Sequence, residues 1–118
     1  MLSVPTLNIL LCTRHADMRK SFDGLVGLVR DFLEADPLSG QLFVFRNKRG
    51  DRVKLLYWDE DGFAIWYKRL EQGTFRFPAA NGDHDGVTIR AADLTMLLDG
   101  VDLSSVKRSK RYRRPQPQ

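Results

Sequence analysis

The segment from residue 41 to residue 78 alternates between extended runs and turn sequences, and this pattern restricts the fold more than any other feature. The runs are rich in aromatic and β-branched residues, which favour strands. The stretches NKRG and DEDG, and the surroundings of Gly73, have the residues that tight turns require. The four runs are Gln41 to Arg46, Arg52 to Trp58, Phe63 to Arg69 and Thr74 to Pro78. Short turns join neighbouring strands in opposite directions, so the sequence predicts an antiparallel meander.

Alternation within the two central runs predicts the face on which each side chain lies. One set of alternate positions is mostly apolar and is expected to face the core: Val53, Leu55, Tyr57, Phe63, Ile65 and Tyr67. The intervening set is mixed and is expected to form a half-exposed face: Lys54, Leu56, Trp58, Ala64, Trp66 and Lys68. This assignment follows from the period of two in a pleated strand.

The rest of the domain contributes two helices and two more strands. One helix is predicted from apolar residues spaced at i, i+3, i+4 and i+7: Phe22, Leu25, Val26, Val29, Phe32 and Leu33. Ser21 is a candidate cap, and Asp36-Pro37 ends the helix. Residues 91–99 predict a second helix that stops at Gly100, and residues 7–12 and 87–89 predict strands.

Together these elements predict an α+β fold over residues 1–105. We expect a mainly antiparallel sheet of about five or six strands. The helix around residues 22–33 packs on one face of this sheet, and the second, short C-terminal helix closes the core. An irregular acidic loop is expected over residues 80–86.

The formal charge of +4 is a property of the end of the chain. Residues 107–114, KRSKRYRR, carry six basic groups and no acid, whereas residues 1–106 hold 13 basic against 15 acidic residues. A block of like charges followed by PQPQ cannot pack, so residues 106–118 are predicted to be a disordered basic tail. Such a tail is expected to solubilise the protein or to bind polyanions without reading a sequence.

Few residues of this chain are suited to catalysis or metal binding. Cys12 is the only cysteine, which excludes an intrachain disulfide and a thiolate cage and fits a reducing cytoplasm. The two histidines, His15 and His84, occur in no metal-ligand or triad spacing. We expect no cofactor, no metal, no small-molecule substrate and no membrane segment. A nuclease remains a weaker alternative, resting on carboxylates near basic groups: Asp17, Asp23, Asp51 and Asp59.

The stretch FVFRNKRGDRVKLLYWD, residues 43–59, places five basic residues between aromatic ones. Cations neutralise phosphates and exposed aromatic rings stack on bases, so the stretch has the composition of a nucleic-acid surface. It also has the composition of a solvated hairpin tip, since lysine and arginine are common there. One continuous positive face in the folded domain would favour DNA, and scattered charge would favour a different partner.

The order of these segments resembles a known family. DMRKSFDGLVGLV, then DPLSGQLFVFRNKRGDRVKLLYWDEDGFAIWYKRLEQGTFRFP and LTMLLDGVDL are similar to the TnpB-type accessory protein of insertion sequence 66 transposons, the product of their second reading frame. The resemblance spans about residues 5–103 and implies a role in transposition without known catalytic activity. It also implies two partners from the same element, a transposase and a small helix-turn-helix protein. One departure is Arg90, where a capping serine or threonine is usual.

The resulting hypothesis is a noncatalytic transposition accessory that bridges transposase and DNA. Phosphate contacts are expected from basic residues of the loop before the first helix and of neighbouring strands, with Trp66 as a stacking surface: Arg19, Lys20, Arg46, Lys48, Arg49, Lys54, Lys68 and Arg69. The alternative is a protein–protein adapter without DNA contact. It rests on the net −2 of residues 1–106 and on bare backbone at Gly24 and Gly27.

Overall fold

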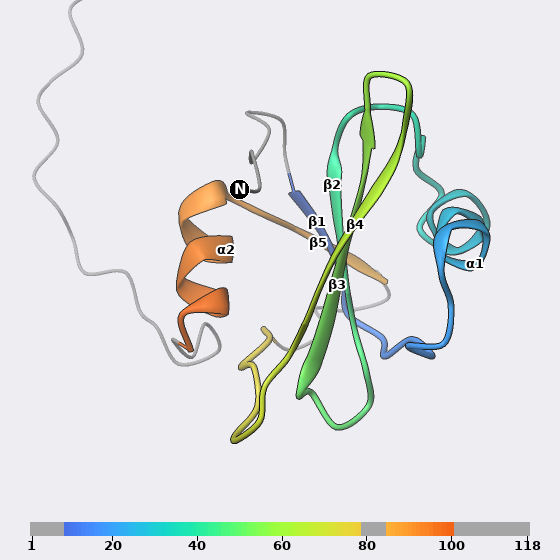
Figure 1. Cartoon of the computed structure of the whole chain (residues 1–118). Helices are drawn as coiled ribbons and strands as arrows, with labels where there is room; N and C mark the ends of the chain where they lie inside the picture. The colour runs from blue at the N-terminus through green and yellow to red at the C-terminus, as the bar shows by residue number, and fades with distance from the viewer. Residues whose placement is uncertain (1–8, 79–84, 101–118) are drawn as a thin grey trace, which may run out of the picture.

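Five strands form one open sheet in the order β4-β3-β2-β1-β5 (Figure 1). The computed structural model describes residues 9–78 and 85–100. The strands are β1 (Ile9–Cys12), β2 (Leu42–Arg46), β3 (Arg52–Asp59), β4 (Gly62–Arg69) and β5 (Gly86–Ile89). β1 runs parallel to β2, and every other neighbouring pair is antiparallel. The predicted α+β class with a mainly antiparallel sheet is therefore confirmed.

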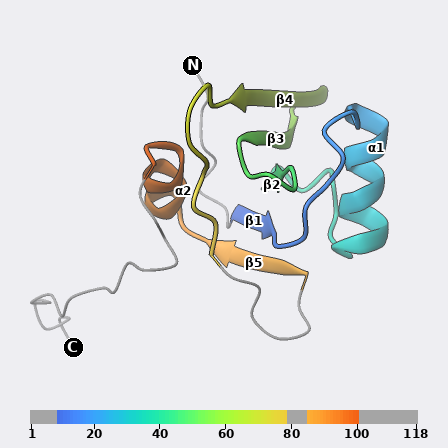
Figure 2. The ribbon, with the colours of Figure 1, turned by 90° about the horizontal axis from the view of Figure 1, so that it is seen from below.

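Helices cover both faces of the sheet, as Figure 2 shows. On one side lies α1 (Phe22–Gly27), which continues as a π-helix, η1 (Leu28–Phe32); on the other lies α2 (Ala91–Leu98). The α1 side buries Leu25 and Val29 against four sheet residues: Cys12, Phe43, Phe45 and Leu56. The α2 side buries Leu94 and Leu97 against another set: Ile9, Leu11, Leu42, Val44, Val53, Leu55 and Ile89. The expectation of one half-exposed face is wrong for the centre of the sheet, because each helix needs an apolar surface to cover its own stripe.

The prediction of which β3 residues lie on the same face of the sheet as which β4 residues is also wrong. Asp59 pairs with Gly62 across a two-residue turn, and Leu55 consequently pairs with Trp66. Residues directly opposite each other share a face, so odd-numbered residues of β3 lie with even-numbered residues of β4. Trp66 therefore joins Leu55 on the α2 side, while Ile65 joins Leu56 on the α1 side.

The fourth run of the predicted meander, residues 74–78, is not a strand. After β4 the chain crosses the end of the sheet, where the Leu70 N–H donates to the Asp51 carbonyl and the Phe75 N–H to the Gly50 carbonyl. Phe75 is buried in the α2-side core and contacts Phe77 edge-to-face. Burial of these rings across the strand ends stabilises this path, and no described segment pairs with the outer edge of β4.

Both helices form where predicted, but their ends differ in detail. Ser21 stands at the N-cap of α1 without a side-chain cap bond, and the helix ends at Phe32, before Asp36-Pro37. Arg90 cannot accept amide bonds at the start of α2; instead the Asp93 carboxylate accepts the Arg90 backbone N–H at 3.1 Å. Gly100, with φ 90°, ends α2 as expected.

Some predictions fall on residues outside the described ranges. These are the first residues of the predicted N-terminal strand, most of the acidic loop with His84, and the basic tail from residue 106. Within the described part of the chain, no helix has the length and apolarity needed to cross a membrane.

Candidate nucleic-acid interface

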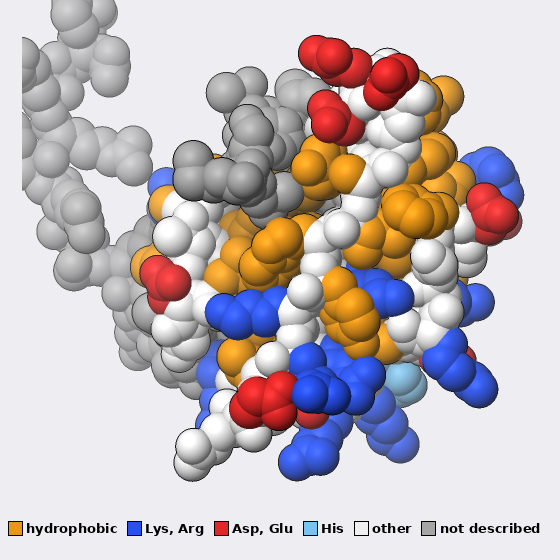
Figure 3. Space-filling view, viewed as in Figure 1, with side chains coloured by type: hydrophobic (Ala, Val, Ile, Leu, Met, Phe, Trp, Pro, Cys, Tyr) orange, Lys and Arg blue, Asp and Glu red, His pale blue; other side chains and the backbone are white. Residues whose placement is uncertain are grey.

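Basic side chains gather at one end of the sheet, which we call the basic end (Figure 3). They come from the end of β2, the turn after it, the start of β3, the end of β4 and the segment that follows β4. The basic end comprises Arg46, Lys48, Arg49, Arg52, Lys68, Arg69 and Arg76. The opposite end carries the turn between β3 and β4, and its three carboxylates, Asp59, Glu60 and Asp61, form the acidic tip.

Asn47 shapes the turn that presents part of the basic end. Its side-chain carbonyl accepts the backbone N–H groups of Gly50 and Arg52 at 2.9 and 3.0 Å. Its amide donates to the Asp51 carboxylate at 2.6 Å, which lowers the pKa of Asp51 below its usual value. Gly50 has φ 85°, a conformation that L side chains rarely adopt. Local side-chain bonds and one glycine therefore fix this turn.

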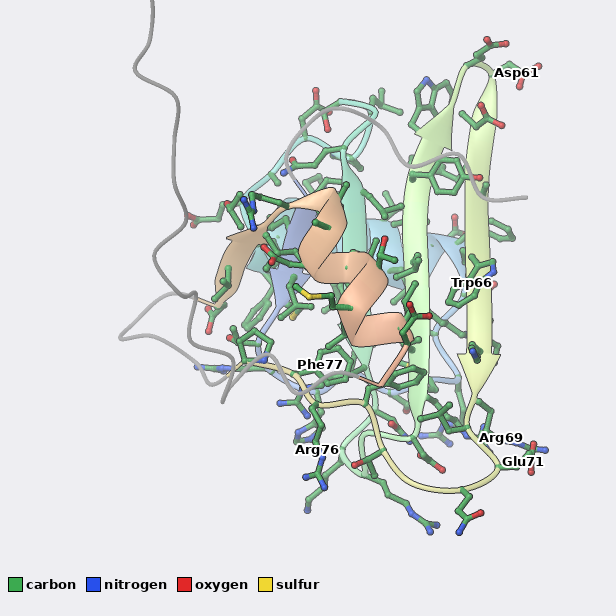
Figure 4. All side chains as sticks on the ribbon, turned by 90° about the vertical axis from the view of Figure 1, so that its left-hand side faces the viewer. Asp61, Trp66, Arg69, Glu71, Arg76 and Phe77 are labelled. Carbon is green, nitrogen blue, oxygen red and sulfur yellow. The ribbon has the colours of Figure 1, made fainter. Side chains whose placement is uncertain are left out.

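Lys48, Arg49 and Arg76 are exposed and make no hydrogen bond or ion pair with any other described residue. Arg76 lies on the segment after β4, and Figure 4 shows it at the same end of the molecule as Arg69. Within the described part of the chain, no ion pair of these three residues has to break before an anion binds. They are the freest charges of the basic end.

Arg52 and Arg69 lie directly opposite each other on β3 and β4. Like charges in this position are destabilising. Arg52 donates to the Tyr67 hydroxyl at 3.0 Å, and Arg69 pairs with Glu71 at 2.8 Å, which raises the pKa of Arg69. Lys68 is exposed and shares the α2-side face with Val53. The fold thus holds cations together here in spite of their repulsion.

Arg46 is partly buried and acts as a brace within the basic end. Its guanidinium donates to the Thr13 carbonyl at 2.6 Å and lies 5.6 Å from the centre of the Phe77 ring. Its Nε atom is buried and has no hydrogen-bond partner among the described residues. These contacts connect β2 to the loop after β1 and to the segment after β4.

Lys54 lies in the interior, with 7% of its surface exposed. Its ammonium donates to the carbonyls of Met18 and Lys20, at 2.7 Å each, and lies 4.7 Å from the centre of the Tyr67 ring. It holds the loop before α1 onto the sheet. This geometry leaves the ammonium without access to a bound phosphate.

The remaining predicted residues lie beside the basic end or away from it. Arg19 is exposed but is bound by Asp17 at 2.7 Å, and the bonds from Arg19 lower the pKa of Asp17 to about 2. Lys20 is exposed on the same loop and makes no side-chain hydrogen bond to another described residue. Trp66 is half-buried against the α2-side core, midway along β4 (Figure 4). The structure therefore brings together only part of the predicted set.

The sequence did not predict Arg52 and Arg76 as contacts, although Arg52 is one of the five basic residues of the stretch 43–59. The signal for Arg76 was the pattern Phe75-Arg76-Phe77, in which the two rings point inward and the arginine is left in solvent. The expectation of a fourth strand concealed it. A strand there would have placed Arg76 along the sheet edge instead of across the strand ends.

Carboxylates do not form a catalytic cluster in the described part of the chain. Asp51 and Asp59 lie at opposite ends of β3, and Asp17 is engaged by Arg19. No three histidine, cysteine, aspartate or glutamate side chains among the described residues are grouped so that they could hold a metal ion. Burial raises the pKa of the Cys12 thiol, which disfavours a thiolate.

Comparison with known families identifies the domain. The family model described as IS66 Orf2 like protein matches residues 7–108. The chain belongs to this family. IS66 Orf2-like proteins are transposition-associated accessory proteins, so membership connects the chain to an IS66 transposon system.

Two relatives come from Sinorhizobium fredii, and both are described only as uncharacterized proteins. The first, y4jC, is 41% identical over 110 residues, covering 92% of this chain and 91% of the relative. The second, y4hO, is 38% identical over 96 residues, covering 81% of this chain and 82% of the relative. No solved structure matches the chain.

Proposed function

We propose that the domain is a noncatalytic accessory of transposition that bridges the transposase and DNA, with the basic end as its DNA contact. The observation that carries this proposal is the gathering of seven cations from separate segments, residues 46–52 and 68–76, which contain only two acids, Asp51 and Glu71. Lys48, Arg49 and Arg76 supply the main phosphate contacts, because they make no hydrogen bond or ion pair with a described residue.

The arrangement of Arg52 and Arg69 supports the same proposal. Two arginines on directly opposite positions cost stability unless an anion lies near both. A DNA backbone supplies a row of such anions, and binding of phosphates relieves the repulsion. Contacts of this kind position a duplex without reading its sequence. Sequence preference would then come from the transposase.

Fluorescence anisotropy with a labelled duplex of the transposon end tests the DNA contact. The background is the full chain in which every lysine and arginine of residues 107–114 is replaced by glutamine, so that the tail does not mask the domain. K48Q/R49Q should weaken binding and reduce the slope of log K against log salt by about 1.8, since each phosphate contact contributes about 0.9. R30Q/R90Q is the control, because it removes two exposed cations outside the basic end. Equal slopes for the two variants would refute the contact.

The second candidate is an adapter that contacts only protein. The acidic tip favours it, because Asp59, Glu60 and Asp61 project from the sheet without an ion pair to a described residue. Gly27 also has open space where a Cβ would lie, whereas Gly24 packs beneath Lys20. If the adapter is correct, D59N/E60Q/D61N should abolish co-purification with the transposase in the presence of nuclease, and K48Q/R49Q should not.

A further inference from the structure

β4 is an edge strand that has no partner on its outer side among the described residues. It is eight residues long, GFAIWYKR, and all its members are half-buried or exposed. Natural edge strands are usually blunted by proline, a bulge, short length or charges along the edge. From Gly62 to Tyr67 this strand has no proline and no charge. The outer edge of β4 is therefore built like a strand that pairs.

The hydrogen-bond pattern shows which backbone groups are free. Leu70 N–H donates to Asp51 O, so even-numbered residues of β4 face β3. Backbone direction alternates along an antiparallel strand, so the odd-numbered residues point their N–H and C=O groups outward. These are Phe63, Ile65, Tyr67 and Arg69.

We propose that a second copy of this chain pairs with β4 in antiparallel orientation, about a two-fold axis at Ile65. To form hydrogen bonds, the odd-numbered residues of one copy must lie opposite odd-numbered residues of the other. The two-fold axis must therefore pass beside a residue and not midway between two residues. Centring on Ile65 sets Phe63 opposite Tyr67 and Asp61 opposite Arg69, with each contact made twice. Aromatic and opposite-charge pairs across strands are both stabilising.

Cross-strand pairs argue for this register over its two neighbours. Centring on Trp66 would set Asp61 opposite Glu71 and Phe63 opposite Arg69. The Ile65 register also has two acids opposite each other, Asp59 and Glu71, but it alone combines the Phe63–Tyr67 and Asp61–Arg69 pairs. Centring on Ala64 would set Asp59 opposite Arg69 but Tyr67 opposite Asp61, so it keeps an ion pair and loses the aromatic pair. Parallel pairing would bring the two acidic tips together and the two basic ends together. Asp61 and Arg69 lie at opposite ends of the molecule (Figure 4), so only the antiparallel arrangement places the acidic tip of one copy beside Arg69 of the other. It also covers part of Tyr67, one of three large apolar side chains that are exposed among the described residues of the single copy, at 45%.

Charge reversal with mixing tests the register, using sedimentation equilibrium of the full chain. D61K and R69E should each weaken self-association by about tenfold, because two attractive pairs become repulsive. Mixing D61K with R69E should restore a dimer, since both contacts are again between opposite charges. E60K is the matched control: it changes the same turn but lies opposite Leu70, so it should associate like the unaltered chain.

Several outcomes would overturn the proposal. They are a chain that stays monomeric at its highest soluble concentration, a mixture that does not recover, or an E60K variant that is weakened as much as D61K. Circular dichroism of each variant confirms that it is folded.

A disulfide trap gives an independent measurement. In a hydrogen-bonded antiparallel pair, opposite Cα atoms lie about 5.5 Å apart, within the range that a disulfide spans. I65C should therefore form a covalent dimer on mild oxidation, while the native Cys12 is buried. T88C, exposed on the other edge strand, is the control for random collision. Equal crosslinking of I65C and T88C would refute pairing at Ile65.

Discussion

The acidic tip and the basic end cap the same two strands, yet they are built in different ways. The acidic tip is local: Asp59 pairs with Gly62, and two residues close the turn. The basic end joins segments that are far apart in the sequence. Lys54 and Arg46 fasten the loop after β1 to it, and Asn47 fixes its turn. Substitutions in the supports of the basic end should therefore be costly, whereas those at the acidic tip should have small, local effects.

The largest difference in the free energy of unfolding is expected between substitutions of two lysines that are six residues apart. Lys54→Met leaves the Met18 and Lys20 carbonyls without a donor and should lower the free energy of unfolding by about 2–4 kcal/mol. Lys48→Met removes an exposed charge and should change it by less than about 0.5 kcal/mol. Urea denaturation measures both. Similar changes in the free energy of unfolding for the two variants would mean that Lys54 does not hold the loop before α1 onto the sheet.

The two turns can be compared through their glycines. Gly50→Ala places a side chain on a residue with φ 85° and should cost about 1–2 kcal/mol from backbone strain alone, because the nearest atom to a new Cβ is 3.6 Å away. Gly62→Ala meets nothing within 4 Å and should be neutral or stabilising by up to about 1 kcal/mol. Thermal melts of both variants provide the measurement, and a reversed order would contradict the assigned turn geometry.

Acid should act on the loop beside the basic end through Asp17. Its pKa is held at about 2 in the folded chain, against an ordinary value of 3.8, first of all by the side-chain bonds from Arg19. A lowered pKa stabilises the fold above pH 3.8, and this contribution is lost as the pH falls toward 2. Arg19→Gln should therefore flatten the pH dependence of unfolding in that window. Arg30→Gln, on η1, should leave it unchanged.

The smallest effect is expected from neutralising the acidic tip in the DNA-binding assay. β3 is eight residues long, which separates the tip from the basic end by roughly 26 Å at 3.3 Å per residue. The Debye length is about 10 Å at 0.1 M salt, so for the single copy, measured below the concentration at which the chain self-associates, D59N/E60Q/D61N should change affinity for the end duplex by less than about twofold. A larger gain would show that the tip itself approaches the DNA.

Local sequence patterns predicted most of the helices and strands, but they did not predict which strands lie next to one another in the sheet. The spacing of Leu25 and Val29 placed the first helix, and turn residues placed the hairpins. Two properties were beyond this reasoning. β1 pairs with β2 and β5, which are distant in sequence, and the faces of β3 and β4 depend on whether their turn has an odd or even number of residues.

The candidate site was predicted in part for the same reason. Lys48 and Arg49 belong to a turn that the sequence identifies, so their exposure could be foreseen. Lys54 reads as an ordinary strand cation, because its carbonyl partners lie 34 and 36 positions away and acquire meaning only after folding. Arg76 was assigned to a strand that does not form.

The central place of β1 has a consequence for the order of folding. β2, β3 and β4 are contiguous and can pair as soon as they are synthesised, whereas β1 waits for β2 on one side and for β5 on the other. Contacts between segments so far apart close late and slow the search for the native state. During synthesis the hydrophobic strand Ile9–Cys12 therefore keeps an unsatisfied edge until Gly86–Ile89 has emerged from the ribosome. A nascent chain stalled before that point would be the form most in need of a chaperone.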